Sequence, residues 1–277
     1  MSTAALRHEV GAFVGFLERQ KNIYQRFWAW EAVWFVYSMV SVMSIGYLAT
    51  GLEATGVGGH VDLRAIQLYL LAGSMLWSYL SLVFMEVAYI VAWERWEGTI
   101  EYTFMAPVRR TTHLLGICVF AVLYGMARTA AVVVVALLVF HVDLSHADLL
   151  AAAVVLAAST VPLIGLGILI AILPLLAPEK GEQMSTALQG LFLLVSGVYY
   201  PVSVLPLPLQ AVGVLSPLTY TLSSIRDALL HGAHVAALLP QVGLLLLMGV
   251  VLIPAALWLF AVAERRAKRL GTLKRSG

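Results

Sequence analysis

Long apolar stretches recur along this 277-residue chain, and they constrain its fold more than any other feature. A helix needs about 20 consecutive apolar residues to cross a bilayer. The sequence predicts six such helices, at residues 31–50, 66–91, 113–140, 149–176, 184–200 and 235–263. Hydrophobic residues make up 61% of the chain and charged residues 12%, whereas soluble domains contain roughly 45–50% and 25%. Residues 1–277 are therefore expected to form a single transmembrane domain of the all-α membrane class.

Few residues in the sequence suggest reactive chemistry. The one cysteine, Cys118, lies in an apolar stretch, which excludes an internal disulfide and a cysteine metal cluster. A metal site needs three or four converging ligands, and the scattered histidines do not supply them, so no metal is expected. No pairing of a nucleophile with a base stands out, so no catalytic residue is assigned.

The first 30 residues are predicted to form an interfacial helix. Between residues 8 and 26, apolar side chains follow one helical stripe and charged side chains lie elsewhere, as in helices that lie in the membrane surface. Phe27, Trp28 and Trp30 follow, which is typical of the aromatic belt at the headgroup level. The alternative is an ordinary cytoplasmic tail helix.

A charged segment, residues 94–110, separates the second and third apolar stretches. Helical spacing places Trp96, Ile100, Thr103 and Phe104 on one side and glutamates on another. Pro107 should stop this helix, because proline lacks the backbone N–H and clashes with the preceding turn. A short amphipathic helix between two spans can lie on lipid or present its apolar face to a partner protein. A solvated loop with a helical turn is the alternative.

Lysine and arginine residues predict the orientation of the chain, because they are enriched in cytoplasmic loops. Six of them lie in the basic tail, residues 264–277, and others lie in the N-terminal helix and in the charged segment. The other side holds only Arg64 and Arg226. With six crossings, both termini and the charged segment are expected to be cytoplasmic.

Residues 201–234 are expected to enter the outer leaflet and return as a re-entrant helical hairpin. A single crossing there would place the basic tail outside, against the charge rule. The segment is also rich in proline: Pro206 and Pro208 should break its first helix, and Pro217 after Ser216 should begin its second. Irregular backbone at membrane depth must be buried in protein or face water. The hairpin is therefore expected to be a pathway or gate element.

Two segments resemble the ABC transporter permeases of the type-2 exporter family. Its pattern E-R-x-x-G-T-[LI]-E, followed by proline, is matched in the charged segment by Glu94, Arg95, Gly98, Thr99, Ile100, Glu101 and Pro107. Its later pattern of small-Gly-aromatic-Pro, Leu-Pro, [NS]-P-L-T-Y and arginine is matched by Ser196, Gly197, Tyr199, Tyr200, Pro201, Leu205, Pro206, Ser216, Pro217, Leu218, Thr219, Tyr220 and Arg226. Both patterns occur in the family's order and spacing. Six spans with cytoplasmic ends fit the family as well, so the resemblance covers nearly the whole chain.

The resemblance implies a half-transporter in a cell membrane, the inner or plasma membrane of a bacterium. It would pair with a second permease copy or a paralogue, and each permease would dock one cytoplasmic ABC ATPase through a coupling helix in the charged segment. Residues expected to take part in ATPase coupling are Glu94, Glu97, Gly98, Thr99, Ile100, Glu101, Phe104 and Pro107, with Ile100 and Phe104 making the contact. The chain has no G-x-x-x-x-G-K-[ST] loop. No cofactor is therefore expected here, and ATP and Mg would bind the partner ATPase; membrane lipid is a further partner, and nucleic acid is not.

Candidates for the translocation pathway or its gate come from the hairpin region and from the spans. They are Tyr199, Tyr200, Pro201, Pro217, Tyr220, Arg226, Glu86 and Arg128. Glu86 and Arg128 are ionisable residues inside spans, which makes them functional candidates. The rise per residue places them at different depths, which argues against a direct pair. Each could instead face the bundle and bind backbone carbonyls or water.

The favoured function is an ATP-driven exporter permease for a drug-like, lipid or other amphipathic substrate. A lipid-linked polysaccharide is the alternative substrate, which would suit the interfacial helix and the aromatic residues of the first span. A membrane-embedded lipid-modifying enzyme is an alternative of another class, but it would need a catalytic cluster at one interface. A passive assembly subunit is a third possibility.

Overall fold

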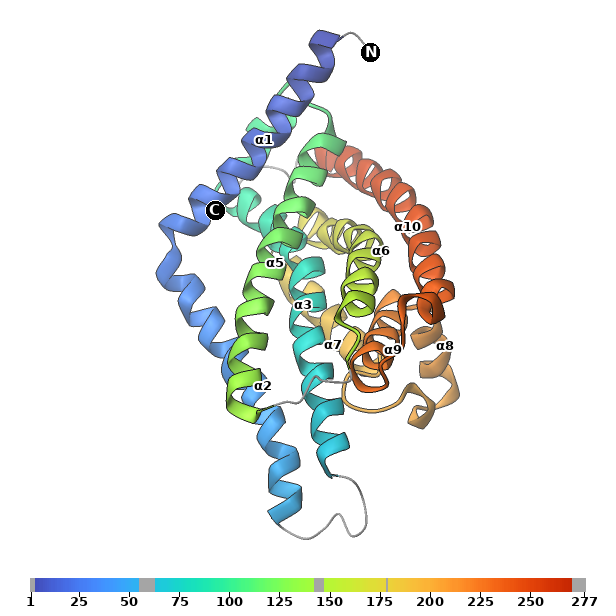
Figure 1. The fold of residues 1–277 in the computed structure, drawn as a ribbon. Helices are drawn as coiled ribbons and strands as arrows, with labels where there is room; N and C mark the ends of the chain where they lie inside the picture. The colour runs from blue at the N-terminus through green and yellow to red at the C-terminus, as the bar shows by residue number, and fades with distance from the viewer. Residues whose placement is uncertain (1–2, 55–62, 142–146, 178, 271–277) are drawn as a thin grey trace.

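The computed structural model describes residues 3–54, 63–141, 147–177 and 179–270, and the regular structure in these ranges is helical (Figure 1). The helices are α1 (Thr3–Arg26), α2 (Trp28–Ala54), α3 (Leu63–Trp96), α4 (Ile100–Met105), α5 (Arg110–Phe140), α6 (Leu149–Leu176), α7 (Gly181–Val195), the 3-10 turn η1 (Val202–Val204), α8 (Leu207–Leu215), α9 (Pro217–Leu230) and α10 (Val235–Leu270). In the described ranges, five of them are long and apolar enough to cross a membrane: α2, α3, α5, α6 and α10.

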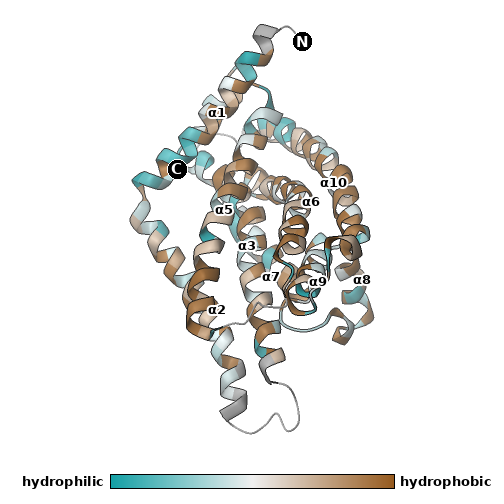
Figure 2. Cartoon of the chain, viewed as in Figure 1, coloured by the Kyte–Doolittle hydropathy of each residue, from teal (hydrophilic) through white to brown (hydrophobic). Residues whose placement is uncertain are grey.

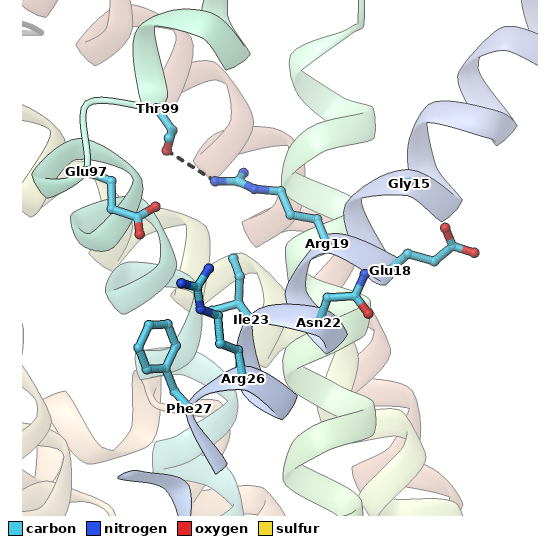
Figure 3. Close-up of a pocket in the computed structure, with 9 residues that line it drawn as sticks. All are labelled: Gly15, Glu18, Arg19, Asn22, Ile23, Arg26, Phe27, Glu97 and Thr99. Carbon is cyan, nitrogen blue, oxygen red and sulfur yellow. Dashed lines mark hydrogen bonds between the residues drawn. The ribbon is translucent and has the colours of Figure 1, made fainter. Parts of the chain in front are cut away.

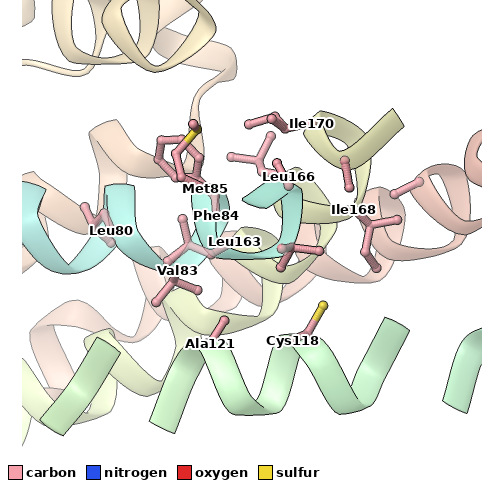
Figure 4. Close-up of a cluster of buried hydrophobic side chains, with 14 of the residues drawn as sticks. Leu80, Val83, Phe84, Met85, Cys118, Ala121, Leu163, Leu166, Ile168 and Ile170 are labelled. Carbon is pink, nitrogen blue, oxygen red and sulfur yellow. The ribbon is translucent and has the colours of Figure 1, made fainter. Parts of the chain in front are cut away.

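Helices α3 and α6 form the centre of the bundle. In the most apolar part of each, 61% of the residues are buried, compared with 11% in α2. Both α3 and α10 pack along α6, and α5 packs against the other side of α3. Figure 4 shows the core between them, where Val83 and Phe84 of α3 lie among Ala121 of α5 and Leu163 of α6. Apolar burial therefore holds α3, α5 and α6 together as one unit.

The contact between α6 and α10 depends on glycine. A Cβ atom at Gly165 would collide with the backbone of α10 beside Leu252, and one at Gly249 would collide with Val161. Small residues let two helix backbones approach closely, which gives van der Waals packing where lipid removes the hydrophobic advantage. The two glycines therefore set how closely α10 follows α6.

One end of the bundle gathers segments that are far apart in the sequence, and we call it the α4 end. Arg19 of α1 forms an ion pair with Glu94 near the end of α3. Arg110 at the start of α5 pairs with Glu264 near the end of α10, with 3.0 Å between the nitrogen and oxygen. Hydrophilic residues concentrate along α1 and at this end (Figure 2). The N-terminal helix, α4 and the last turns of α10 therefore share one side of the bundle.

The opposite end joins α6 to the junction of α9 and α10. Asp148 caps α6, because its side chain accepts a bond from the backbone N–H of Ala151. It also lies 2.8 Å from Nδ1 of His234, and its own backbone N–H donates to the carbonyl of Ala228. The bond from the Ala151 N–H and the His234 interaction lower the pKa of Asp148 below its usual value. The turn before α10 is thus fastened to the start of α6.

Helix α7 is shorter than the span expected at residues 184–200. Its 15 residues extend about 22 Å, less than the roughly 30 Å of a hydrocarbon core, so it is not among the five long helices. Ser196 and Gly197 end it in a turn whose glycine has a φ of +74°, a conformation that glycine adopts without strain. The described structure thus gives five long apolar helices and one short one.

The segment at residues 201–234 contains η1, α8 and α9, which lie together away from the α4 end (Figure 1). We expected Pro206 and Pro208 to break a helix, but instead they begin one. Pro206 precedes α8 and Pro208 lies in its first turn. Proline is compatible with a first turn because the N–H groups there have no helical partner. Pro217 begins α9 after Ser216, as predicted.

Helix α10 extends to Leu270, so residues 264–270 of the expected tail are helical, and residues 271–277 lie outside the described residues. The ion pair between Glu264 and Lys268, one turn apart, supports this extension. Helix α6 likewise continues through Pro162 and Pro174 and ends at Leu176.

Candidate functional site

A tight turn and a short helix at the α4 end make up the first motif. Helix α3 ends at Trp96, residues 97–99 form the turn, and α4 follows. Gly98 in this turn has a φ of +77°, which L side chains rarely adopt. Helix α4 ends at Met105, two residues before Pro107, as the proline predicts.

Arg110 holds α4 against the bundle. Its guanidinium lies 4.4 Å from the ring centre of Phe104, and it donates to the carbonyl oxygens of Thr103, at 2.8 Å, and of Phe104. The same guanidinium pairs with Glu264 of α10. Arginine suits this position because its planar fork carries five N–H donors and also stacks on aromatic rings. One side chain of α5 therefore links α4 to α10.

The apolar side of α4 faces inward, which corrects the expectation that Ile100 and Phe104 make the contact with a partner. Ile100 is 0% and Phe104 7% exposed, because both are packed into the core of the bundle. Tyr102 is 75% and Met105 72% exposed. The face that α4 offers to another molecule is therefore built on Tyr102 and Met105.

Glu94 is the centre of a buried polar group. It is 1% exposed, and its carboxylate binds Arg19 of α1 and lies 3.2 Å from Nε2 of His113 on α5. Arg19 also donates to the hydroxyl of Thr99 in the turn, at 3.2 Å. Buried charges are costly unless they are paired, and here the pairing crosses three helices. Glu94 thus joins α1 to the turn that carries α4.

Arg95, the next residue, binds α6. It is 4% exposed, and its guanidinium donates to the carbonyl of Pro174, at 3.0 Å, and to that of Leu175. These carbonyls belong to the last turn of α6, where they have no helical N–H partner. The adjacent motif residues Glu94 and Arg95 therefore hold α1, α5 and α6 around the base of α4. Glu97 and Glu101, by contrast, make no side-chain bond with the described residues.

Arg226 organises the second motif. It is 6% exposed on α9, and its guanidinium donates to the carbonyls of Gly197, at 2.7 Å, and of Val198. The same group lies 3.7 Å from the ring centre of Tyr69 on α3. A Cβ atom at Gly73 would collide with this arginine and with the Val198 carbonyl. Arg226 thus closes the turn after α7 onto α3.

The aromatic and proline candidates of this motif lie around that turn. The hydroxyl of Tyr200 donates to the Leu194 carbonyl at 2.8 Å, and that of Tyr220 donates to the Val214 carbonyl at 2.9 Å. Tyr199 is half-buried and packs against the main core. Pro201 is exposed and Pro217 is buried. The two tyrosine hydroxyls therefore bind nearby backbone.

Glu86 and Arg128 are not brought together as an ion pair in the described structure. Arg128 turns toward α2, where it donates to the Trp34 carbonyl and, at 2.7 Å, to the hydroxyl of Ser38. Glu86 is 8% exposed on α3, and one of its carboxylate oxygens is buried without a hydrogen-bond partner among the described residues. Neither residue lies in the groups around α4 or Arg226.

Arg19, Arg110, His113 and Glu264 are the functional candidates that the sequence did not indicate. Arg110, His113 and Glu264 lie near helix ends and Arg19 lies within α1, where each resembles an ordinary interfacial charged or polar residue. The only signal was position, because all four fall at predicted cytoplasmic ends. Among the described residues, no group of three or more His, Cys, Asp or Glu side chains could hold a metal ion.

In the described ranges, a bundle of five helices that are long and apolar enough to cross a membrane defines a multi-pass membrane protein. A family model described as ABC-2 type transporter matches residues 18–230, which include both motifs, and the chain belongs to this family. This confirms the resemblance drawn from the two motifs. The chain is therefore a multi-pass membrane protein and a permease of an ABC-2 system, a transport subunit. No curated protein matches its sequence.

Proposed function

We propose that this permease works as an ATP-driven exporter, and that α4 transmits the conformational change of a separate cytoplasmic ATPase to the membrane helices. The observation that carries the proposal is the clamp on α4: Arg110 ties it to α5 and α10, while Glu94 and Arg95 tie its base to α1, α5 and α6. A helix held in this way transmits a push to several spans at once. A loosely attached helix would move alone.

The proposed topology has six crossings, with both termini in the cytoplasm. Three segments rich in Lys and Arg lie at the α4 end: α1, the start of α5 and the last turns of α10. The sixth crossing is α7, continued by the turn at residues 196–198, which reaches the level of Gly73 on α3. Helices α8 and α9 then enter and leave the outer leaflet. The charge rule favours this arrangement over one with five crossings.

The ATPase should dock on Tyr102 and Met105. Tyr102→Asp or Met105→Asp places a charge in an apolar contact, so we expect complex formation with the ATPase to weaken at least tenfold, about 1.4 kcal/mol. Tyr102→Phe and Met105→Leu are the matched controls, because they change the same two exposed positions without adding a charge. Binding of the purified chains can be measured together with ATP hydrolysis.

Two results would count against this docking face. Wild-type binding and transport in Tyr102→Asp and Met105→Asp would place the contact elsewhere. Transport that persists without any ATPase would contradict the ATP-driven mechanism itself. Screening candidate compounds for stimulation of ATP hydrolysis by the complex would then identify the substrate, which we propose is drug-like, lipid or otherwise amphipathic.

A lipid-linked polysaccharide is the second candidate substrate, and one observation favours it. Trp30, Trp34 and Tyr37 form an exposed row along α2, with neighbouring rings 6.3 and 5.8 Å apart. Aromatic faces with a polar tip can stack on sugar rings as well as on lipid. Stimulation of ATP hydrolysis by a lipid-linked oligosaccharide, and its loss in Trp34→Ala, would favour this substrate over small amphipathic molecules.

A further inference from the structure

A groove of about 690 Å³, lined by charged and polar residues together with Ile23 and Phe27, lies between α1 and the turn before α4 (Figure 3). Its walls come from two separate segments, residues 15–27 of α1 and the junction after it, and residues 97–99. The ion pair between Arg19 and Glu94 and the bond from Arg19 to Thr99 fix the distance between the walls. The groove is therefore a built feature of the α4 end, because the contacts of Arg19 join its two walls.

Opposite charges face each other across this groove without touching. The guanidinium of Arg26 and the carboxylate of Glu97 point into the opening from the two walls, while Glu18 points away (Figure 3). Among the described residues, neither side chain has a hydrogen bond or an ion pair, and Arg26 only stacks beside Phe27, 5.9 Å from the ring centre. Arg19 adds N–H donors, because its five exceed those used by Glu94 and Thr99.

A cluster of exposed aromatic residues adjoins the groove at Phe27, which lines it. Phe27 lies 6.1 Å from Trp93, and Trp93 lies 5.2 Å from Trp96, as ring-centre distances. Trp28 and Trp96 are 70% and 67% exposed. Tryptophan gathers at the level of lipid headgroups, where its ring is apolar and its N–H is hydrated. The groove therefore opens at headgroup depth and not into the hydrocarbon.

We propose that this groove binds the headgroup of an aminophospholipid, with phosphoethanolamine as the ligand chemistry. The phosphate would lie against Arg26 and the free donors of Arg19, and the primary ammonium would donate to Glu97. A zwitterion satisfies both walls at once, which a lone anion or a lone cation cannot do. Charge-assisted hydrogen bonds of this kind are about twice as strong as neutral ones.

The same reasoning ranks other headgroups below phosphoethanolamine. A choline headgroup carries no N–H, so Glu97 would lose its hydrogen bond. A glycerol headgroup leaves Glu97 without a cation and places a net anion beside it. Because the ligand bridges α1 and the turn at residues 97–99, its binding would hold α1 in place beside α4. The inference depends on the interfacial position that the sequence predicts for α1 and not on the transported substrate.

The test is lipid binding to the full-length permease by native mass spectrometry, with phosphatidylethanolamine, phosphatidylcholine and phosphatidylglycerol titrated separately. We expect phosphatidylethanolamine to bind most tightly. Arg26→Gln should weaken it about tenfold, as expected for one charge-assisted bond, and Arg26→Lys should restore part of the loss. Glu97→Gln should remove the preference over phosphatidylglycerol. Arg7→Gln and Glu179→Gln, at exposed sites outside the groove, are matched controls and should bind as the wild type does.

Soluble phosphoethanolamine, offered without acyl chains, separates a lipid from a free metabolite. Binding of the soluble compound as tightly as the lipid would overturn the lipid assignment. Equal binding of the three lipids, or unchanged binding in both Arg26→Gln and Glu97→Gln, would overturn the site. Because this assay needs no ATPase, its failure would leave the proposed export function untouched, and failed export would leave the lipid site untouched.

Discussion

Arg226 and Arg110 make the same kinds of contact, with backbone carbonyls and an aromatic ring, at two ends of the molecule. Each guanidinium donates to backbone carbonyls of a turn or helix end and stacks on an aromatic ring, Tyr69 in one case and Phe104 in the other. Arg226 is buried, and Arg110 is partly exposed. The carbonyls have no helical partner, so each arginine satisfies atoms that burial would otherwise leave unbonded. Lysine could not do this, because a point charge lacks the planar fork.

At the residue scale, Arg226→Met should destabilise the permease. The change leaves the carbonyls of Gly197 and Val198 without their donor, and bonds to a charged group contribute about 1.5–3 kcal/mol each. We expect a fall of several degrees in the apparent melting temperature of the purified protein. Ser223→Ala, an exposed position on the same helix, is the control. An unchanged melting temperature would mean that the turn after α7 does not need Arg226.

Arg110→Lys tests whether the clamp on α4 transmits force. The lysine keeps a charge for Glu264 but loses the fork that binds the carbonyls of Thr103 and Phe104. We expect the ATPase to bind normally while transport per ATP hydrolysed falls severalfold. If transport and hydrolysis stay in their wild-type ratio, the Arg110 contacts only stabilise the fold.

At the scale of elements, α9 is polar yet buried, which explains how its charge is accommodated. Ser224 is 1% and Arg226 6% exposed, because α9 packs on α6, α3 and α10, so these groups lie within protein and not in lipid. Placing these polar groups in hydrocarbon would cost free energy, whereas the protein supplies hydrogen-bond partners for Arg226. The segment at residues 201–234 is thus suited to lie inside the outer half of the bundle.

Cysteine labelling tests the proposed re-entrant path. After replacement of the buried Cys118 by alanine, single cysteines at Leu209, Ser224 and Ala233 should label differently in intact cells. We expect an impermeant thiol reagent to reach position 233 readily from outside, and position 224 slowly because it is buried. Labelling of position 233 only from the cytoplasm would show that residues 201–234 cross the membrane.

At the scale of the whole molecule, burial is uneven. The central helices α3 and α6 are covered, whereas α2, α5 and α10 keep apolar faces that nothing in the described chain covers. Leu138 on α5 is 71% exposed, and Val250 on α10 is 67% exposed. Lipid or a second permease can cover such faces, and we propose that a second permease covers one of them, as the resemblance to the type-2 exporter family implies.

The assembled complex should therefore contain two permeases and two ATPases. Native mass spectrometry of the co-purified chains in detergent measures this stoichiometry directly. We expect the two-plus-two mass with ATPase present, and dissociation into smaller species with Tyr102→Asp. A stable complex of one permease with one ATPase would contradict the proposed pairing of two permeases.

The sequence by itself determined the class of the protein and the positions of its motifs. Length and hydropathy of the apolar stretches suffice to identify membrane helices, because hydrogen bonding inside lipid leaves few alternatives. Pro107 and Pro217 marked the end of α4 and the start of α9, because proline acts on the backbone locally. The two motifs also identified the family without any knowledge of contacts.

Only the tertiary structure decided which faces are covered. Periodicity placed Ile100 and Phe104 on one side of a helix, but Arg110 and Glu264, 154 residues apart, turned that side inward. The same holds for Arg26 and Glu97, whose facing charges follow from the way α1 packs along α5. The periodicity of the sequence shows which side chains share one face of a helix. Whether that face is buried depends on residues that are distant in the chain.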